Sequence, residues 1–299
     1  MQIEFNGIYA HKETLEGKDI FFFSDVQENI DHKTVASFGE EWEAFASFTD
    51  EEIRIAGDQY FDIIEPNMIE GKTALDVGCG SGRWTRYVAS KAACVEAIDP
   101  SKAVYSAAHL LRDIPNTRIS QAGVDNIPFP DNSFDFVFSL GVLHHIPDTQ
   151  KAMQSCIHKL KSGGHFLVYL YYDFEQRGLL FKLIFQISNL FRFFISKLPA
   201  TLKKWVCNGI AFFVYAPLVF LSRSIAALGM TTLANKIPLS YYRIHSFHIM
   251  KNDALDRFGT PLEQRFSRAK IHEMMEQCGL EAIKISDGEP YWHAVGRKK

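Results

Sequence analysis

The strongest structural signal in the chain is the segment Leu75-Asp76-Val77-Gly78-Cys79-Gly80-Ser81-Gly82. A short apolar run leads into three glycines, and a helical pattern follows at once, so the segment predicts a strand that turns into a helix. Glycines at such a turn let the backbone approach a ligand closely, and the first amides of the helix are free to bind it. The segment therefore predicts a ligand-binding loop.

Strands and helices alternate around this loop. Apolar runs predict strands at 73–77, 94–98, 117–122, 134–140 and 165–170, with helices at 83–90, 102–112 and 149–160. Strands separated by helices of this length are typical of parallel βαβ units. A helix at 267–278 and two late strands at 280–286 and 291–296 follow. The fold class predicted is α/β, with a doubly wound, mostly parallel sheet.

These patterns divide the 299 residues into three parts. A helical pattern at 51–65 predicts an N-terminal helical cap over 1–66. The sheet domain takes 67–175 and resumes at 256–299, and a hydrophobic helical insertion fills 176–255.

The composition is that of a globular protein. Hydrophobic residues make up 47% and charged residues 22%, which excludes the disordered and collagen-like classes. The five cysteines are scattered and form no CxxC pair, which disfavours a disulfide framework or a zinc finger and favours a reducing compartment. The N-terminus lacks the basic stretch and apolar run of a secretory signal. We therefore expect a cytoplasmic protein without a metal site.

An acid downstream of the loop indicates the kind of cofactor. Asp99 ends the second predicted strand, 21 residues after Gly78, and a carboxylate there suits hydrogen bonds from ribose hydroxyls. Loop and acid together predict an adenosine-containing cofactor. A nicotinamide cofactor would need the spacing GxGxxG, with a third glycine at position 83. That position is Arg83 and the third glycine is Gly82, which disfavours a nicotinamide-dependent oxidoreductase.

Three stretches resemble the class I S-adenosylmethionine-dependent methyltransferases, in particular those of type 11. They are LDVGCGSGRWTRYVA at 75–89, VEAIDPS at 95–101 and NIPFPDNSFDFVFSLGVLHHIPD at 126–148. The resemblance runs from about residue 72 to 170 and resumes at 267–299. It implies a Rossmann-like, seven-stranded sheet with an antiparallel last strand, S-adenosyl-L-methionine as the cofactor, and methyl transfer as the activity.

The resemblance also implies roles for single residues. The loop positions expected around the methionine part of the cofactor are Asp76, Gly78, Gly80 and Gly82, and Asp99 is expected to bind the ribose. The family's acid for the adenine amino group falls on Gly123 here, followed by Val124, with Asp125 nearby as a substitute. Backbone carbonyls at Ser139 and Leu140 are expected to meet the methionine ammonium.

Three histidines are candidates for a general base. His144 and His145 follow the fourth predicted strand, where active sites lie in such sheets. His245, with His248 close by, lies at the end of the insertion. A purely structural role stays open for each of them. The segment also lacks the Asn/Asp-Pro-Pro-Tyr motif of enzymes that methylate nucleobase or glutamine amino groups, which leaves oxygen, aliphatic nitrogen or carbon acceptors.

The insertion has an unusual charge pattern. Residues 176–252 contain ten Lys or Arg and no Asp or Glu, whereas the rest of the chain carries a net charge of −13. Residues 205–222 are 18 consecutive uncharged residues. Three interpretations stay open: a helical lid packed over the acceptor, an interfacial surface for an anionic membrane, which would make the protein peripheral, and a membrane span. Nucleic acid is disfavoured as a partner, because the basic residues are interleaved with apolar runs.

We expect an S-adenosylmethionine-dependent methyltransferase that methylates a hydroxyl on a saccharide, lipid-linked or secondary-metabolite acceptor. The alternatives are a catalytically silent, membrane-docked binding protein and a nicotinamide-dependent oxidoreductase.

Overall fold

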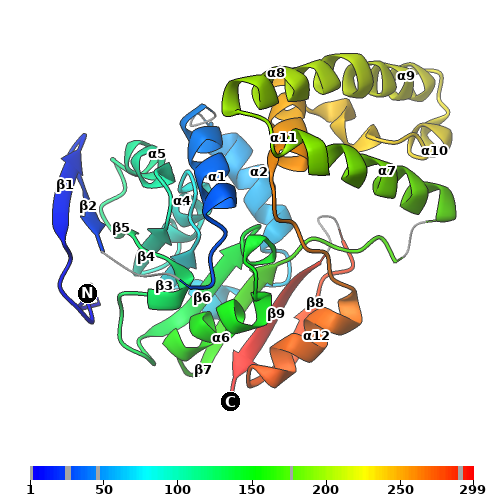
Figure 1. Ribbon diagram of the computed structural model, residues 1–299. Coiled ribbons are helices and arrows are strands. Elements are labelled where there is room, and N and C mark those ends of the chain that lie inside the picture. The colour runs from blue at the N-terminus through cyan, green and yellow to red at the C-terminus, as the bar shows by residue number, and fades with distance from the viewer. Residues whose placement is uncertain (1–2, 24–27, 45–47, 176–177, 289–291) are drawn as a thin grey trace. The chain divides into compact units, whose positions relative to one another are not determined.

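The computed structural model describes residues 3–23, 28–44, 48–175, 178–288 and 292–299 (Figure 1). These residues form two compact units. The first comprises Met1–Gln176 and Leu262–Lys299, and the second comprises Arg177–Pro261.

The first unit is built on one sheet. Within the described residues it has nine strands, in the order β1-β2-β5-β4-β3-β6-β7-β9-β8. The strands are β1 (His11–Leu15), β2 (Lys18–Phe22), β3 (Thr73–Val77), β4 (Cys94–Asp99), β5 (Thr117–Gln121), β6 (Phe134–Leu140), β7 (Leu160–Tyr169), β8 (Leu280–Ile285) and β9 (His293–Lys298). Strands β2 to β7 pair in parallel, and β9 is antiparallel to both neighbours. The predicted α/β, mostly parallel sheet with an antiparallel last strand is confirmed.

Two strands of this sheet were not predicted. The hairpin β1–β2 pairs with β5 through Ile20 and Ile119, and it extends the expected seven strands to nine (Figure 1). The N-terminal helical cap expected over 1–66 therefore contains a hairpin as well as helices. The turn at Glu16 and Gly17 has positive φ at both residues, which suits the twist of a tight hairpin.

Alternating side chains of the strands pack on opposite faces. Leu75 and Val137 lie in a buried cluster with residues of α6 (Thr149–Lys159) and α12 (Arg268–Gln277). Their neighbours Ala74 and Phe136 lie in another, with residues of α2 (Asp50–Tyr60), α3 (Pro66–Ile69) and α4 (Arg83–Ala89). The helix α5 (Ala103–Leu110) covers β4 and β5. Because a parallel sheet is covered on both faces, the side chains of its strands are mostly apolar.

The order of strands creates a place for a ligand. From β3 the chain runs to β4 on one side, and later returns to β6 on the other side. Such a switch of direction leaves a crevice at the carboxyl ends of the strands, where ligands bind in open α/β sheets. The glycine loop follows β3 at this point.

The second unit is helical. It contains α7 (Leu179–Ile195), α8 (Ala200–Ile210), α9 (Ala216–Ala227), α10 (Thr231–Ala234) and α11 (Phe247–Gly259), with a π-helical turn at Ala211–Tyr215 that makes α8 and α9 continuous (Figure 1). Its core contains Cys207, Ala211, Tyr215 and Val219. Their spacing of four residues puts them on one face of the helix, and that face packs against α11.

A buried ion pair joins two central strands of the first unit. Glu96 of β4 stands opposite Arg118 of β5, and the guanidinium donates to both carboxylate oxygens at 2.8 and 2.9 Å. The guanidinium also lies 4.0 Å from the centre of the Phe5 ring and donates to the carbonyl of Ile3. Burial raises the pKa of Glu96, and Arg118 opposes that shift.

We predict that Glu96→Ala destabilises the protein by about 3–5 kcal/mol, because a buried guanidinium is left without its partner. The double variant Glu96→Leu/Arg118→Met should recover most of this loss, since two apolar side chains replace both charges. Urea unfolding measures the difference. Asp19→Ala, which breaks the exposed Lys12–Asp19 pair, is the control and should cost far less. A single variant as stable as the parent would contradict the prediction.

Candidate active site

The glycine loop adopts a backbone that needs glycine. Gly78, Gly80 and Gly82 all have positive φ, at 81°, 53° and 82°. A Cβ on Gly78 would lie 2.5 Å from the side chain of Val142, so no larger residue fits there without a shift. The loop ends at Gly82, which begins α4. The sequence-based prediction of a strand, a glycine turn and a helix is confirmed here.

Asp99 fastens this loop to the neighbouring strand. Its Oδ2 accepts a hydrogen bond from the amide of Gly80 at 3.0 Å, and its Oδ1 accepts from the amide and hydroxyl of Ser101 at 2.8 and 2.6 Å. The carboxyl is buried, and burial raises its pKa. A carboxylate has about four lone-pair positions, so three donors leave it the capacity to accept one more bond.

Asp76 is a buried acid beside the same loop. Its Oδ2 accepts a hydrogen bond from the hydroxyl of Thr85 at 2.6 Å, while its Oδ1 has no partner among the described residues. Burial raises the pKa of Asp76 to about 7. A buried oxygen without a donor is costly, so this atom suits a ligand that supplies a donor.

The stretch expected to meet the adenine ring has a different arrangement. Val124 begins a short 3₁₀ turn and is buried. Asp125 accepts hydrogen bonds at Oδ2 from the amides of Glu28 and Asn29, at 3.1 and 2.6 Å, and its Oδ1 has no partner among the described residues. One oxygen of Asp125 therefore holds the N-terminal segment in place, and the other is left for a ligand.

The end of β6 borders the loop. The hydroxyl of Ser139 donates to the carbonyl of Val77 at 2.8 Å, which ties β6 to β3 at their carboxyl ends. Leu140 follows and is buried, and Gly141 after it has a positive φ of 81°. These contacts fix the backbone beside the glycine loop.

His144 and His145 lie in one 3₁₀ turn after β6. His144 is fully buried, with its ring centre 3.9 Å from that of Tyr171 and 4.0 Å from that of His145. Burial lowers the pKa of His144 well below its usual range, and the charges of His145 and Arg265 lower it further. The ring of His145 makes a hydrogen bond through Nδ1 to the carbonyl of Leu262 at 2.7 Å.

His245 belongs to the second unit. Its ring centre lies 4.5 Å from that of Tyr241, and burial lowers its pKa. The structure thus groups two of the three candidate histidines in the unit that holds the glycine loop.

The first unit has another cluster of polar side chains, which the sequence analysis did not predict. Nε2 of His293 lies 2.6 Å from Oδ1 of Asp62, and Oδ2 of Asp62 accepts from the hydroxyl of Ser286 at 3.2 Å. His293 is buried and pairs with Tyr169 at the carboxyl end of β7. More than 200 residues separate Asp62 from His293, so no local spacing signalled the pair.

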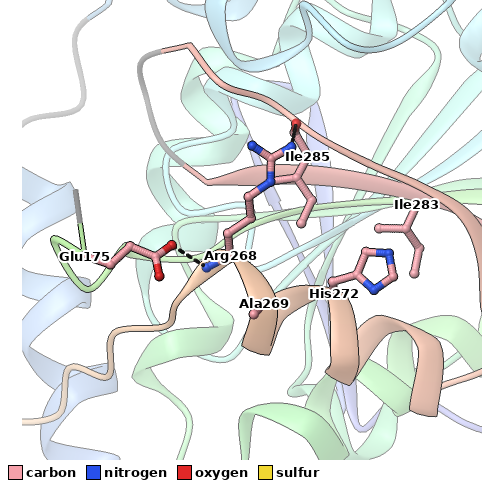
Figure 2. Close-up of a pocket in the computed structure, with 6 residues that line it drawn as sticks. All are labelled: Glu175, Arg268, Ala269, His272, Ile283 and Ile285. Carbon is pink, nitrogen blue, oxygen red and sulfur yellow. Dashed lines mark hydrogen bonds between the residues drawn. The ribbon is translucent and has the colours of Figure 1, made fainter.

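A separate cavity of about 400 Å³ lies between α12 and β8 (Figure 2). Its lining residues are Glu175, Arg268, Ala269, His272, Ile283 and Ile285. Figure 2 shows the Arg268 side chain turned toward the Ile285 carbonyl, to which it donates at 3.3 Å. None of the residues predicted for the cofactor lines this cavity.

Among the described parts of the chain, no group of three or more His, Cys, Asp or Glu side chains is placed to hold a metal ion.

Comparisons with known proteins match the part that holds the loop. A family model described as "Methyltransferase domain" matches residues 75–168. The chain is 34% identical over 110 residues to a demethylmenaquinone methyltransferase of Geobacillus, covering 33% of this chain and 44% of that protein. It is 31% identical over 153 residues to a ubiquinone biosynthesis O-methyltransferase of Marinobacter nauticus, covering 47% and 63%.

A third relative is named for a different acceptor. The chain is 31% identical over 112 residues to a tRNA U34 carboxymethyltransferase of Nautilia profundicola, covering 36% of this chain and 37% of that protein. The chain thus spans less than two thirds of the length of each of these three relatives.

The match and the geometry agree. The matched residues contain the glycine loop, Asp99 and the His144–His145 turn, and the sheet has the antiparallel last strand that the resemblance implies. Residues 75–168 therefore match a methyltransferase domain, and the fold around them is that of the class I S-adenosylmethionine-dependent methyltransferases, whose cofactor is S-adenosylmethionine.

Proposed function

We propose that this protein transfers a methyl group from S-adenosylmethionine to a hydroxyl oxygen. The observation that carries the proposal is a pair of buried carboxylates, Asp76 and Asp99, beside a glycine loop with positive φ. The cofactor carries an ammonium group and ribose hydroxyls, which are hydrogen-bond donors. Buried acceptors with spare lone pairs suit such donors, and the unpartnered Oδ1 of Asp76 is the best example.

Each residue of the site has a role in this proposal. Oδ1 of Asp76 accepts from the ammonium group, and the carboxylate of Asp99 accepts from the ribose. The other residues proposed to line the cofactor are Gly78, Gly80, Gly82, Val124, Asp125 and Leu140. Asp125 contributes through Oδ1 alone, because Oδ2 is occupied by backbone amides.

Bound S-adenosylmethionine supplies an electrophilic methyl group. The protein's share is then to align the acceptor, which is worth up to about 7–11 kcal/mol, and to remove the hydroxyl proton. His145 suits the second task, because its hydrogen bond from Nδ1 to the carbonyl of Leu262 puts the ring proton on Nδ1 and the lone pair on Nε2. We propose that Nε2 of His145 takes the proton and that His144, enclosed between two rings, packs the turn.

The acceptor proposed is a large, partly apolar molecule: a saccharide, a lipid-linked compound or a secondary metabolite. One relative is named an O-methyltransferase, which favours oxygen as the acceptor atom. The matched relatives share only part of this chain, and the helical second unit lies outside the matched family model. A screen of cell extracts with methyl-labelled cofactor tests the acceptor class directly.

Two other functions give different results in one experiment. A catalytically silent binding protein would bind S-adenosylmethionine without turnover on any extract. An oxidoreductase would bind NADH, which the GxGxG spacing disfavours. Calorimetric titration with both cofactors, followed by the extract screen, distinguishes the three.

Asp99→Asn should weaken cofactor binding about 10- to 100-fold, because a neutral amide replaces a charge-assisted acceptor worth about 1.5–3 kcal/mol. Calorimetric titration measures the change. Ser101→Ala is the matched control: it removes one donor to Asp99 and leaves the carboxylate, so its effect should be smaller. Cofactor affinity unchanged in Asp99→Asn would show that the ribose lies elsewhere.

Cofactor affinity should also depend on pH through Asp76. With a pKa of about 7 in the free protein, Asp76 is half protonated near neutrality, and a bound ammonium favours the ionised form. Affinity should therefore fall by up to about tenfold per pH unit as the pH drops below about 7. Titrations between about pH 5.5 and about pH 7.5 measure this slope.

Asp76→Asn should bind more weakly at the upper end of that range and lose the slope. The substitution should weaken cofactor binding but stabilise the folded protein. Because the pKa of Asp76 is raised in the folded state, ionisation of Asp76 lowers the stability of the protein as pH rises from about 4 through about 7. The neutral amide avoids this loss, so the variant should have a higher melting temperature at pH 7. A variant with the parent's pH slope would refute the role of Asp76.

His145→Gln should lower turnover about 100-fold or more and leave cofactor affinity nearly unchanged, because a base contributes about 10²–10⁴-fold. His144→Gln, at the buried neighbour, should instead lower the melting temperature along with the activity. Initial rates, calorimetric titration and thermal unfolding are measured on both variants. If the loss of rate were confined to His144→Gln, His144 would be the base and His145 the residue that packs the turn.

A further inference from the structure

The helix α7 turns its polar side toward the rest of its unit. Arg257 of α11 donates through Nη2 to the hydroxyl of Ser188 and to Oδ1 of Asn189, both at 2.8 Å. Its guanidinium also lies 4.4 Å from the centre of the Phe185 ring. The contacts between α7 and α11 therefore include polar ones, beside the apolar packing of Ile195 against α11.

The other side of α7 is apolar and exposed. It consists of Leu183, Ile184, Ile187, Leu190, Phe191 and Phe194. Their spacing follows the 3.6-residue period of one helix face. A helix on the surface of a water-soluble protein has the reverse arrangement, with the apolar face inward. This reversal favours a nonaqueous partner for the exposed face.

The long helix α8–α9 has a second bare face. Its inner face is the buried row that packs on α11. On other sides of the helix, the side chains of Trp205, Phe213 and Phe220 are 73%, 76% and 72% exposed. The stretch Thr201–Ala227 is long and apolar enough to cross a membrane, yet only 22% of its most apolar window is buried.

Several contacts favour a helix lying on a membrane over one crossing it. A helix that crosses a bilayer alone meets lipid all round, whereas this helix packs one face in a protein core. Within it, the buried hydroxyl of Ser222 donates to the carbonyl of Ala234. The guanidinium of Arg223 donates to the carbonyls of Arg243 and His245. These bonds anchor the helix in its own unit.

The charge of the unit identifies the partner's sign. Residues 177–261 contain eleven Lys or Arg and two Asp or Glu. Several of these cations are exposed: Lys197, Lys204, Arg223 and Lys236. Apolar faces combined with cations are complementary to a bilayer that carries anionic headgroups.

We propose that residues 177–261 dock on the surface of an anionic lipid bilayer, with the bare faces of α7 and α8–α9 lying in the interfacial layer. This goes beyond methyl transfer and does not depend on it. In combination with that activity, docking would hold the enzyme where a lipid-linked acceptor resides.

Vesicle sedimentation of the full chain is the first test. The vesicles are pure phosphatidylcholine or phosphatidylcholine with phosphatidylglycerol. Binding to the anionic vesicles should exceed binding to the neutral ones at least tenfold and should weaken as salt rises from about 50 to about 500 mM, where screening is strong. No binding to anionic vesicles at low salt would overturn the proposal, and so would equal binding to both kinds.

Variants locate the surface. Phe191→Glu with Phe213→Glu puts carboxylates on both bare faces and should lower binding at least tenfold. Ile55→Glu, at an exposed residue of α2, is the matched control and should bind as the parent does. Equal losses in both would overturn the assignment. Calorimetric titration with S-adenosylmethionine on every variant separates this outcome from failure of the proposed function, since cofactor binding should be unchanged.

Two further measurements distinguish interfacial docking from a membrane span and from a dimer: the depth of Trp205 in the bilayer and the self-association of the protein. Trp205 is exposed, whereas Trp84 and Trp292 are buried. The fluorescence of Trp205 should therefore shift to the blue on binding. Quenching should be strongest with bromine placed high on the acyl chain, whereas strongest quenching at the bilayer centre would mean a span and overturn the interfacial geometry. Sedimentation velocity should give a monomer without vesicles. If the parent is instead a dimer and the variant Phe191→Glu with Phe213→Glu is a monomer, the bare faces of α7 and α8–α9 bind a second copy of the chain.

Discussion

The hydrogen bond from the amide of Gly80 to the carboxylate of Asp99 is the contact on which the site depends. It joins the loop after β3 to the end of β4, so these two neighbouring strands share one buried acid at the site. The positive φ angles of the glycines bring the loop close enough for this bond. Ser139, which donates to Val77, fastens β6 to β3 from the other side.

The same site contains groups that do not stabilise the free protein. Asp76 is buried with one oxygen unpartnered, and its pKa is raised to about 7. An uncompensated buried acid costs stability, and such costs are typical of sites prepared for a ligand. In the neighbouring strands, by contrast, the buried carboxylate of Glu96 has the guanidinium of Arg118 as its partner. The first unit thus combines a well-satisfied sheet with an unsatisfied loop.

The second unit departs from the ordinary rule in the opposite direction. Its unfavourable feature is on the surface, where α7 and α8–α9 leave apolar faces exposed to solvent. Its interior is satisfied by the core around Ala211 and by the hydrogen bonds of Arg257 to α7. The two units therefore separate two tasks: one holds a small polar cofactor, and the other carries the apolar surface for which we propose a bilayer.

The glycine motif, Asp99 and the βα alternation were sufficient to predict the parallel sheet and the loop, because local periodicity and turn chemistry control both. The hairpin β1–β2 was not predicted, since its pairing with β5 joins residues about 100 positions apart. The same reason hid the contact of His293 with Asp62 and the use of Asp125 to hold the amides of Glu28 and Asn29. The sequence likewise determined that the insertion is basic and amphipathic. Which face of α7 packs inward became visible only in the folded unit, because helix periodicity defines two faces and leaves the choice between them to the neighbouring helix.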